Sequence, residues 1–374
     1  MKRQSIWRAG VVVLLLLGLL SAIRIEPEPP EDTTPDEMPG SADALTPPRM
    51  PSGFIWIDQE RLKRLPVEGS AWRNIRRAAL APIRAPNWGD QADSTNVTVL
   101  AKALVHARTG DPMMRETVIH ACRLGIGSAD RGSALSLGKQ LMAYVLAADL
   151  VGLPESLDER FRAELRRLRA HVFPSGKTLQ STHRTRPNNW GTFAGATRLA
   201  IAAYLGDEAA FSDVARVFKG WLGDRDQYHG FDFKNPAWQA DPQRPVGINP
   251  SGSTRDGRSI DGVLPDDQRR GGGFQWPPPK ENYVYSALQG ALAQAVILHR
   301  AGYPVWQWED RALLRAFQWL HQEADYPAEG DDTWQPHIIN YYYDADFPAR
   351  IPTRPGKNMG WSDWTHPTGH DPSL

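Results

Sequence analysis

Apolar residues recur at helical spacing along most of the chain from about Ile55 onward. Long helices are predicted over residues 97–105, 137–146, 193–203 and 288–296, and shorter ones over 113–124, 159–170, 209–222 and 308–324. Each long face is soon followed by a glycine, the residue that most often ends a helix: Gly110, Gly152, Gly206 and Gly302. No run of alternating apolar and polar residues is long enough for a sheet. The pattern therefore predicts an all-α fold of antiparallel helical hairpins arranged side by side.

Two long segments interrupt this helical pattern, residues 224–280 and 327–374. Both are polar, aromatic and rich in glycine or proline. Loops of this length inside a helical domain are usually functional rather than simple connections. We expect them to lie together at one end of the helices and to build a cleft there.

The first 23 residues have the composition of an export signal. Lys2, Arg3 and Arg8 precede an uncharged apolar run from Ala9 to Ile23. The run is short for a bilayer span, which favours a cleaved signal peptide. The large Leu20 stands where a cleavage site needs a small residue, which favours a retained membrane anchor. Both alternatives predict an exported body that is periplasmic or extracellular, attached to the membrane through residues 9–23 in the second case.

Residues 24–52 are rich in Pro, Glu, Asp and Thr and contain few apolar side chains. Such a segment cannot bury enough surface to offset its ordering entropy, so it is predicted to be a disordered linker. The helical domain would then occupy residues 53–374.

The amino-acid composition argues against several classes of function and site. The 43 basic residues equal the 43 acidic ones, whereas nucleic-acid-binding proteins normally carry a basic excess. The single cysteine, Cys122, lies in an apolar run, so it cannot form an internal disulfide and is expected in the core. The acidic cluster at residues 224–232 lacks calcium-loop spacing, and neither a metal nor a cofactor is predicted. The sequence leaves the oligomeric state open.

The stretch from Asp261 to Tyr285 carries the most candidate chemistry. Its glycine triplet and proline triplet exclude regular secondary structure. Arg269, Arg270, Glu281 and Tyr283 are therefore expected on a long loop and at the start of the helix that follows it.

A second polar stretch, residues 186–191, precedes another predicted helix. Asn188 and Asn189 offer amide donors there. Amide and guanidinium groups can neutralise a sugar carboxylate, which acidifies the adjacent carbon. A tyrosine such as Tyr283 at a helix N-terminus could then remove the C5 proton and protonate the departing glycosidic oxygen.

Together these motifs resemble the alginate lyase family, among the helical-toroid polysaccharide lyases. That family has Asn-Asn-His at the start of one inner helix, a DGxLPxE-like segment, an Arg-rich turn, and an Asn-Tyr pair opening the next inner helix. The corresponding residues here are Asn188-Asn189-Trp190, Asp261–Asp266, Arg269-Arg270 and Asn282-Tyr283. The resemblance spans roughly residues 90–325.

The resemblance implies an (α/α) toroid, an incomplete barrel of antiparallel helical hairpins. It implies β-elimination of an acidic, uronic-acid-containing polysaccharide, with Asn189 and Arg270 on the substrate carboxylate and Tyr283 as acid and base. Further substrate contacts are expected from residues around these three: Asn188, Trp190, Arg269, Trp276, Glu281, Asn282 and Tyr341.

Two departures from the family pattern affect the expected site. Trp190 replaces the family histidine, and His229 and His337 are candidates to supply the missing group. The insertion between Arg270 and Tyr283 is longer than in the family pattern. The sequence therefore does not identify which uronate polymer is the substrate. It also does not distinguish endo from exo cleavage.

Other interpretations remain open at this stage. Asn188 and Asn189 could only cap a helix, the Arg pair could be a solvated loop feature, and Tyr283 could be a packing aromatic. A glycoside hydrolase would use two carboxylates, for which Asp266, Asp267 and Glu281 are candidates. A non-catalytic envelope glycan-binding protein is the third alternative, and the missing histidine is its best support.

Overall fold

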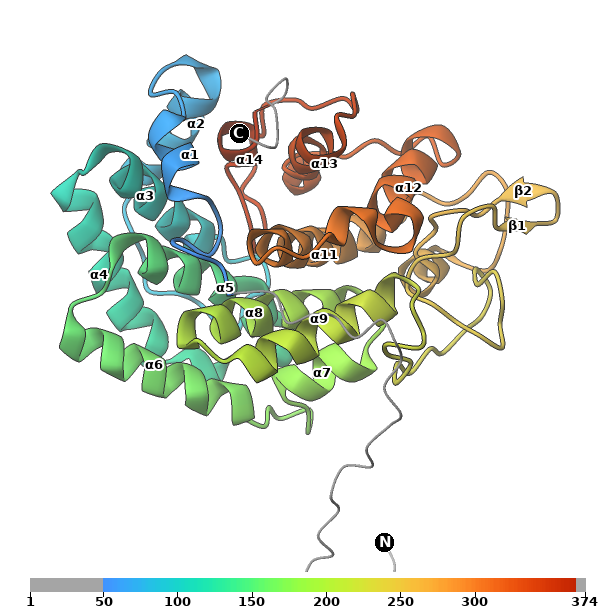
Figure 1. Ribbon diagram of the computed structural model, residues 1–374, viewed down its shortest axis with the longest axis horizontal. Coiled ribbons are helices and arrows are strands. Elements are labelled where there is room, and N and C mark those ends of the chain that lie inside the picture. The colour runs from blue at the N-terminus through green and yellow to red at the C-terminus, as the bar shows by residue number, and fades with distance from the viewer. Residues whose placement is uncertain (1–49, 368–374) are drawn as a thin grey trace, which may run out of the picture. The chain divides into compact units, whose positions relative to one another are not determined.

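Helices make up most of the computed structural model, which describes residues 50–367 (Figure 1). The chain divides into two units, Met1–Thr46 and Pro47–Leu374. The predicted leader at residues 1–23 and nearly all of the predicted linker lie outside the described residues. The all-α prediction is confirmed for the part of the chain that the structure describes.

The first hairpins are formed by α1 (Gln59–Arg64), α2 (Gly69–Leu80), α3 (Thr95–Thr109), α4 (Pro112–Ile126), η1 (Ala129–Arg131), α5 (Ala134–Val151), α6 (Glu155–Ala170), α7 (Leu179–Thr185), α8 (Asn189–Leu205) and α9 (Glu208–Leu222). The remaining elements are β1 (Thr254–Arg255), β2 (Arg258–Ser259), α10 (Pro265–Gln268), η2 (Arg269–Gly271), α11 (Asn282–Arg300), η3 (Val305–Gln307), α12 (Trp308–Gln322), η4 (Gly330–Asp332), α13 (Gln335–Tyr343) and α14 (Ser362–Thr365).

Helix ends follow the signals in the sequence. Helices α3 and α8 end at Gly110 and Gly206, which adopt left-handed φ values of 76° and 70°. Asp111 opens α4 by accepting hydrogen bonds from the backbone of the first turn. Ser133 opens α5 through a reciprocal capping box with Ser136. These caps set the hairpin boundaries close to the predicted ones.

Four long helices pack in sequence order to form the centre of the domain: α3 contacts α5, α5 contacts α8, and α8 contacts α11. Two glycines allow the close approach. A Cβ on Gly138 would lie 3.1 Å from the backbone nitrogen of Ala194, and one on Gly290 would lie 2.5 Å from the carbonyl carbon of Thr192. Helix α5 is apolar and long enough to cross a membrane, but it is 94% buried within the fold, as expected of a core helix.

The shorter helices lie against this central row. Helices α2, α4, α7 and α9 contact α3, α5 and α8, and α12 packs on α9. At the C-terminal end α14 contacts both α13 and α2. The (α/α) toroid, expected as an incomplete barrel of antiparallel hairpins, stays a prediction.

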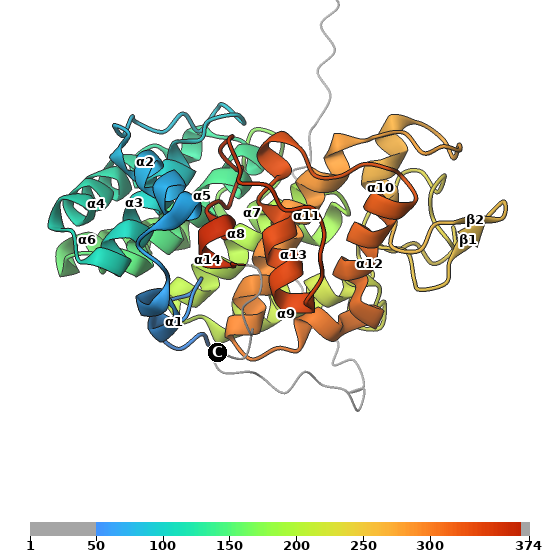
Figure 2. The same ribbon diagram turned by 90° about the horizontal axis from the view of Figure 1, so that it is seen from above.

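The two long segments that were expected to be loops differ in their secondary structure. Residues 224–280 are largely irregular, as predicted, with one short antiparallel hairpin of β1 and β2. Residues 327–374 were predicted as a cleft loop, and this is wrong for much of the segment. It contains α13 and α14, and it buries Trp334, Trp361 and Trp364 to 5% exposure or less (Figure 2). Trp361 Nε1 donates to the carbonyl of Val97 at 2.9 Å, which ties this segment to α3.

Candidate functional site

The two polar stretches of the sequence meet at the N-termini of α8 and α11, and the short helix α10 joins them. Asp266 on α10 accepts hydrogen bonds from Asn188 Nδ2 at 3.1 Å and from Arg269 Nε at 2.8 Å. The neighbouring Asp267 accepts from the backbone nitrogen of Asn189 at 3.2 Å. The start of α8 and the arginine turn are thereby held in one polar network.

The turn into α8 is tightly closed. Asn188 is its N-cap, and its side-chain oxygen accepts from the backbone nitrogen of Trp190 at 3.2 Å. A Cβ on Gly191 would lie 1.9 Å from the carbonyl oxygen of Arg186, so only glycine fits this position. Asn188 thus caps the helix, which was the alternative to a direct role in substrate binding. This cap orients the next residue, Asn189.

Asn189 is almost fully buried, with 2% of its surface exposed. Its Oδ1 atom and the Oδ2 atom of Asp267 are buried and lack hydrogen-bond partners in the described part of the chain. Burial, and after it the charge of Asp266, raises the pKa of Asp267 well above its usual value. The hydrogen bond that Asp267 accepts from the Asn189 backbone nitrogen holds the first residue of α8 in place.

Tyr283 projects from the first turn of α11 and remains 40% exposed. Glu281 caps the helix by accepting from the Tyr283 backbone nitrogen at 3.0 Å. The guanidinium carbon of Arg270 lies 3.7 Å from the centre of the Tyr283 ring. Within the described residues the phenol makes no hydrogen bond and Arg270 makes no ion pair within 4 Å. A phenol and a guanidinium are therefore presented together at one surface.

A second stacked cation lies at the start of α8. The guanidinium carbon of Arg186 is 5.8 Å from the ring of Trp190, the half-buried residue at the family histidine position. Arg186 was not predicted as a site residue. Its only signal in the sequence is its place two residues before the asparagine pair.

The two candidate histidines make no hydrogen bond with the tyrosine, the arginines or the asparagine pair. His229 is exposed, and its Nδ1 lies 3.0 Å from the carbonyl oxygen of Arg225. His337 lies on α13 with 7% of its surface exposed, and its Nε2 is 3.1 Å from the carbonyl oxygen of Arg350. Burial lowers the pKa of His337. A catalytic role for either residue stays a prediction.

The remaining candidates are spread over the domain. Asn282, the first residue of α11, is exposed beside Tyr283. Trp276 is half-buried in the long loop, with the guanidinium carbon of Arg258 5.3 Å from its ring. Tyr341 is only 2% exposed, and the Arg61 guanidinium lies 4.2 Å from its ring. The expectation that Tyr341 lines the cleft is therefore corrected: it is a core residue packed beneath Arg61.

The carboxylates proposed for a hydrolase are buried or take part in helix capping. Asp266 and Asp267 are 2% and 1% exposed, and both hold the start of α8. Glu281 is engaged as the cap of α11. A hydrolase needs two carboxylates that face the scissile bond from opposite sides, and this arrangement does not provide them.

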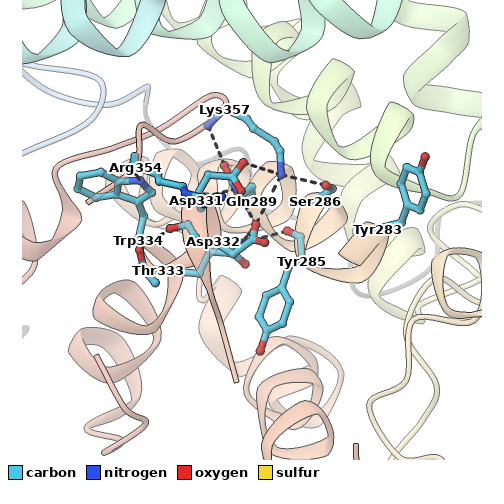
Figure 3. A network of polar contacts seen from close by, with 12 residues as sticks. Tyr283, Tyr285, Ser286, Gln289, Asp331, Asp332, Thr333, Trp334, Arg354 and Lys357 are labelled. Atoms are coloured by element: carbon cyan, nitrogen blue, oxygen red, sulfur yellow. Dashed lines mark hydrogen bonds and ion pairs between the residues drawn. The ribbon is translucent and has the colours of Figure 1, made fainter. Parts of the chain in front are cut away.

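One turn beyond Tyr283, a polar network that the sequence did not predict joins α11 to the C-terminal segment (Figure 3). Lys357 Nζ lies 2.8 Å from Asp331, 3.7 Å from Asp332 and 3.2 Å from the hydroxyl of Ser286. Gln289 donates to Asp332 at 2.8 Å and accepts from the Lys357 backbone nitrogen at 3.1 Å. Burial raises the pKa of Asp332 to about 6, an effect that Lys357 opposes. A lone lysine far along the chain gives no local signal of such a network.

No group of three or more His, Cys, Asp or Glu side chains suited to hold a metal ion occurs within residues 50–367. The chemistry that this arrangement offers is that of amide, guanidinium, ammonium and phenol groups at neighbouring helix N-termini.

The comparison with protein families supports the resemblance inferred from the motifs. The model of the alginate lyase family matches residues 112–227, from α4 to just beyond α9. Asn188 and Asn189 lie within the matched part, whereas Arg270 and Tyr283 lie beyond it. No curated protein matches the chain. The chain is thus similar to alginate lyases over this part, and the similarity supports polysaccharide lyase activity in general.

Proposed function

We propose that this chain is a polysaccharide lyase that cleaves a uronic-acid-containing, alginate-like polysaccharide by β-elimination. The observation that carries the proposal is the pairing of Tyr283 with Arg270, whose guanidinium carbon lies 3.7 Å from the centre of the tyrosine ring. The amide of Asn189, at the start of α8, supplies the third group. A phenol, a guanidinium and an amide donor are the groups that this reaction requires on one face of the substrate.

In the proposed mechanism the substrate carboxylate is bound by Arg270 and by Asn189 Nδ2, which donates to no described residue. Neutralising the carboxylate makes the C5 proton more acidic. The deprotonated Tyr283 oxygen takes this proton, and the C5–H electron pair forms the C4–C5 double bond. The C4–O4 bond breaks, and Tyr283 returns the proton to O4 of the leaving sugar. One proton thus moves from C5 to O4, and the tyrosine is regenerated as it began.

Several observations favour this mechanism over the alternatives. The phenol is exposed, unlike the two aspartates that a hydrolase would need. Trp190 leaves no histidine beside the asparagine pair, and His229 and His337 make no hydrogen bond with the proposed machinery. We therefore assign the proton exchange with the substrate to Tyr283, the exposed phenol of this group.

The test is an ultraviolet assay for unsaturated uronate ends. The full chain is incubated with polymannuronate, polyguluronate, glucuronan, pectate, hyaluronan and chondroitin. We expect the absorbance to rise on at least one polymer, and Tyr283→Phe to lower kcat by about 100-fold or more, because the variant loses only the proton-transferring hydroxyl.

Tyr285→Phe is the matched control on the same helix. Its ring points away from that of Tyr283 (Figure 3), and its hydroxyl donates to the Tyr326 carbonyl at 2.6 Å. This variant should lose stability but keep kcat. Full activity of Tyr283→Phe would move the base elsewhere, and reducing ends without absorbance would identify a hydrolase. Binding without any product would favour the glycan-binding alternative.

A further inference from the structure

A cavity lies beside the Lys357 network, between the central helices and the C-terminal segment. Its volume is about 410 Å³, within the range of small-molecule sites. Three parts of the chain line it: residues 91–94 before α3, Lys139 on α5, and residues 331 and 354–357. One of its lining residues, Lys357, also contacts Ser286 of α11, the helix that carries Tyr283.

Three cations and two acids line this cavity, and the acids are already engaged. Asp331 is paired with Lys357 at 2.8 Å. Asp93 accepts from backbone nitrogens of its own loop, at 2.6 Å from Asn87 and 2.7 Å from Thr95. Lys139 and the exposed Arg354 are left without a carboxylate partner within 4 Å among the described residues.

Lys139 is the unusual member of this set. It is 8% exposed, its ammonium group donates no hydrogen bond to a described residue, and its Nζ lies 5.6 Å from the centre of the Phe193 ring of α8. Burial, and after it repulsion from Lys357, lowers the pKa of Lys139 to about 8. A buried ammonium is normally paired, because desolvation without a partner is strongly unfavourable. An anion in the cavity would provide the missing partner.

We infer that this cavity is a second carboxylate subsite, in which Lys139 and Arg354 bind a uronate unit of the chain being cleaved at Tyr283. The inference rests on the proposed function, since it takes the same polymer as ligand. Ser286 connects the two sites: it lies one turn after Tyr283 on α11, and its hydroxyl accepts a hydrogen bond from Lys357 (Figure 3). Lys357 itself is paired with Asp331 and forms part of the cavity lining.

The surroundings suit an extended saccharide. A second cavity of about 530 Å³ is lined by residues 81–98 and shares Ala92, Asp93 and Ser94 with the first. Two adjoining cavities can accommodate successive sugar units of one chain.

The experiment measures binding separately from cleavage. The full chain carrying Tyr283→Phe is titrated by calorimetry with tetrasaccharides of mannuronate, guluronate and glucuronate. The same tetrasaccharides with their carboxyls reduced to hydroxymethyl groups serve as neutral probes. Lys139→Met, which removes the charge and keeps the side-chain length, should weaken binding of a uronate tetrasaccharide by roughly tenfold or more. It should leave binding of the neutral probe unchanged.

Two further variants guard against a folding artefact. Lys139→Arg keeps the charge and should retain most of the affinity, and Arg354→Gln alters an exposed residue and should weaken binding without loss of thermal stability. The subsite is overturned if Lys139→Met binds uronate as its parent does, or loses affinity equally for the neutral probe. Equal affinity for a sulfated oligosaccharide overturns the assignment to carboxylate.

The same variants separate failure of the subsite from failure of the proposed function. If the wild type cleaves a uronate polymer through Tyr283 while Lys139→Met keeps the wild-type KM, only the subsite is wrong. If no uronate polymer is cleaved and none of the tetrasaccharides binds, both proposals are wrong.

Discussion

Asp266 joins the two halves of the proposed site, and replacing it is the most direct test of the site's architecture. Its carboxylate accepts from Asn188 at the start of α8 and from Arg269 in the arginine turn. Asp266→Asn keeps the size of the side chain but removes the charge. It leaves a single acceptor oxygen for two donors and adds an amide donor next to the amide of Asn188.

The size of the effect follows from burial. A hydrogen bond to a charged group contributes about 1.5–3 kcal/mol, and Asp266 is 2% exposed, so water cannot replace it as acceptor. Arg269 is 22% exposed and can regain some hydration, and the new asparagine can still accept one bond. We therefore expect a loss of about 2 kcal/mol in the free energy of unfolding. With an unfolding entropy of about 2.1 cal/mol/K per residue, this lowers the Tm of a domain that runs from Pro47 to Leu374 by roughly 3 °C.

The assay combines unfolding with kinetics. Urea unfolding and calorimetry give the loss of stability, and the ultraviolet lyase assay gives kcat, which should fall roughly 10- to 100-fold as Asn189 and Arg270 lose their common support. Arg269→Gln and the double variant complete a mutant cycle, in which the coupling should exceed about 0.5 kcal/mol. The reasoning would be refuted if the stability losses of the two single variants simply add up in the double variant. It would also be refuted if the Tm of Asp266→Asn lay within about 1 °C of the wild-type Tm.

Two further predictions concern stability. Gly191→Ala should destabilise the domain by about 1–3 kcal/mol or more and lower kcat, because the new methyl would lie 1.9 Å from the Arg186 carbonyl oxygen. The control in thermal unfolding is Gly127→Ala, whose Cβ would lie 4.0 Å from the nearest atom. Burial raises the pKa of Asp149 to about 6, so its proton stabilises the folded state below about pH 4, and this contribution is lost as the pH rises through 6. Asp149→Asn should remove up to roughly 2–3 kcal/mol of this pH dependence, measured by urea unfolding at pH 4 and pH 7, and an unchanged pH profile would contradict the assignment.

A helix could be predicted from the sequence where apolar residues recur at helical spacing and a helix-ending residue follows them. Helices α3 and α8 combine a clear apolar face with a terminal Gly110 or Gly206 in the left-handed conformation. The segment after residue 327 lacked both signals. Helix α13 is only nine residues long, begins near a proline and carries three consecutive tyrosines. Its burial depends on long-range contacts with α11 and α12, which no local pattern reveals.

The candidate site was predictable only in its linear motifs. The sequence led to the expectation that residues 186–191 and 261–285 form one site, which stays a prediction. The structure joins Asn188 and Asn189 to Asp266 and Asp267 by hydrogen bonds. It offered Asp266 and Asp267 as hydrolase carboxylates because their burial could not be seen. It gave no reason to consider Lys139, since a lysine within an apolar helix is conspicuous only when the cavity that it faces is known.

The tryptophan at the family histidine position need not remove the chemistry, because the site supplies positive charge by other means. Two guanidinium groups are held against aromatic faces at adjacent helix N-termini, Arg186 over Trp190 and Arg270 over Tyr283. The guanidinium group of an arginine side chain can neutralise a carboxylate but does not serve as a base. Under the proposed mechanism both proton transfers therefore fall to Tyr283. The replacement of histidine by tryptophan then removes a second titrating group from the site and leaves the reaction dependent on a single phenol.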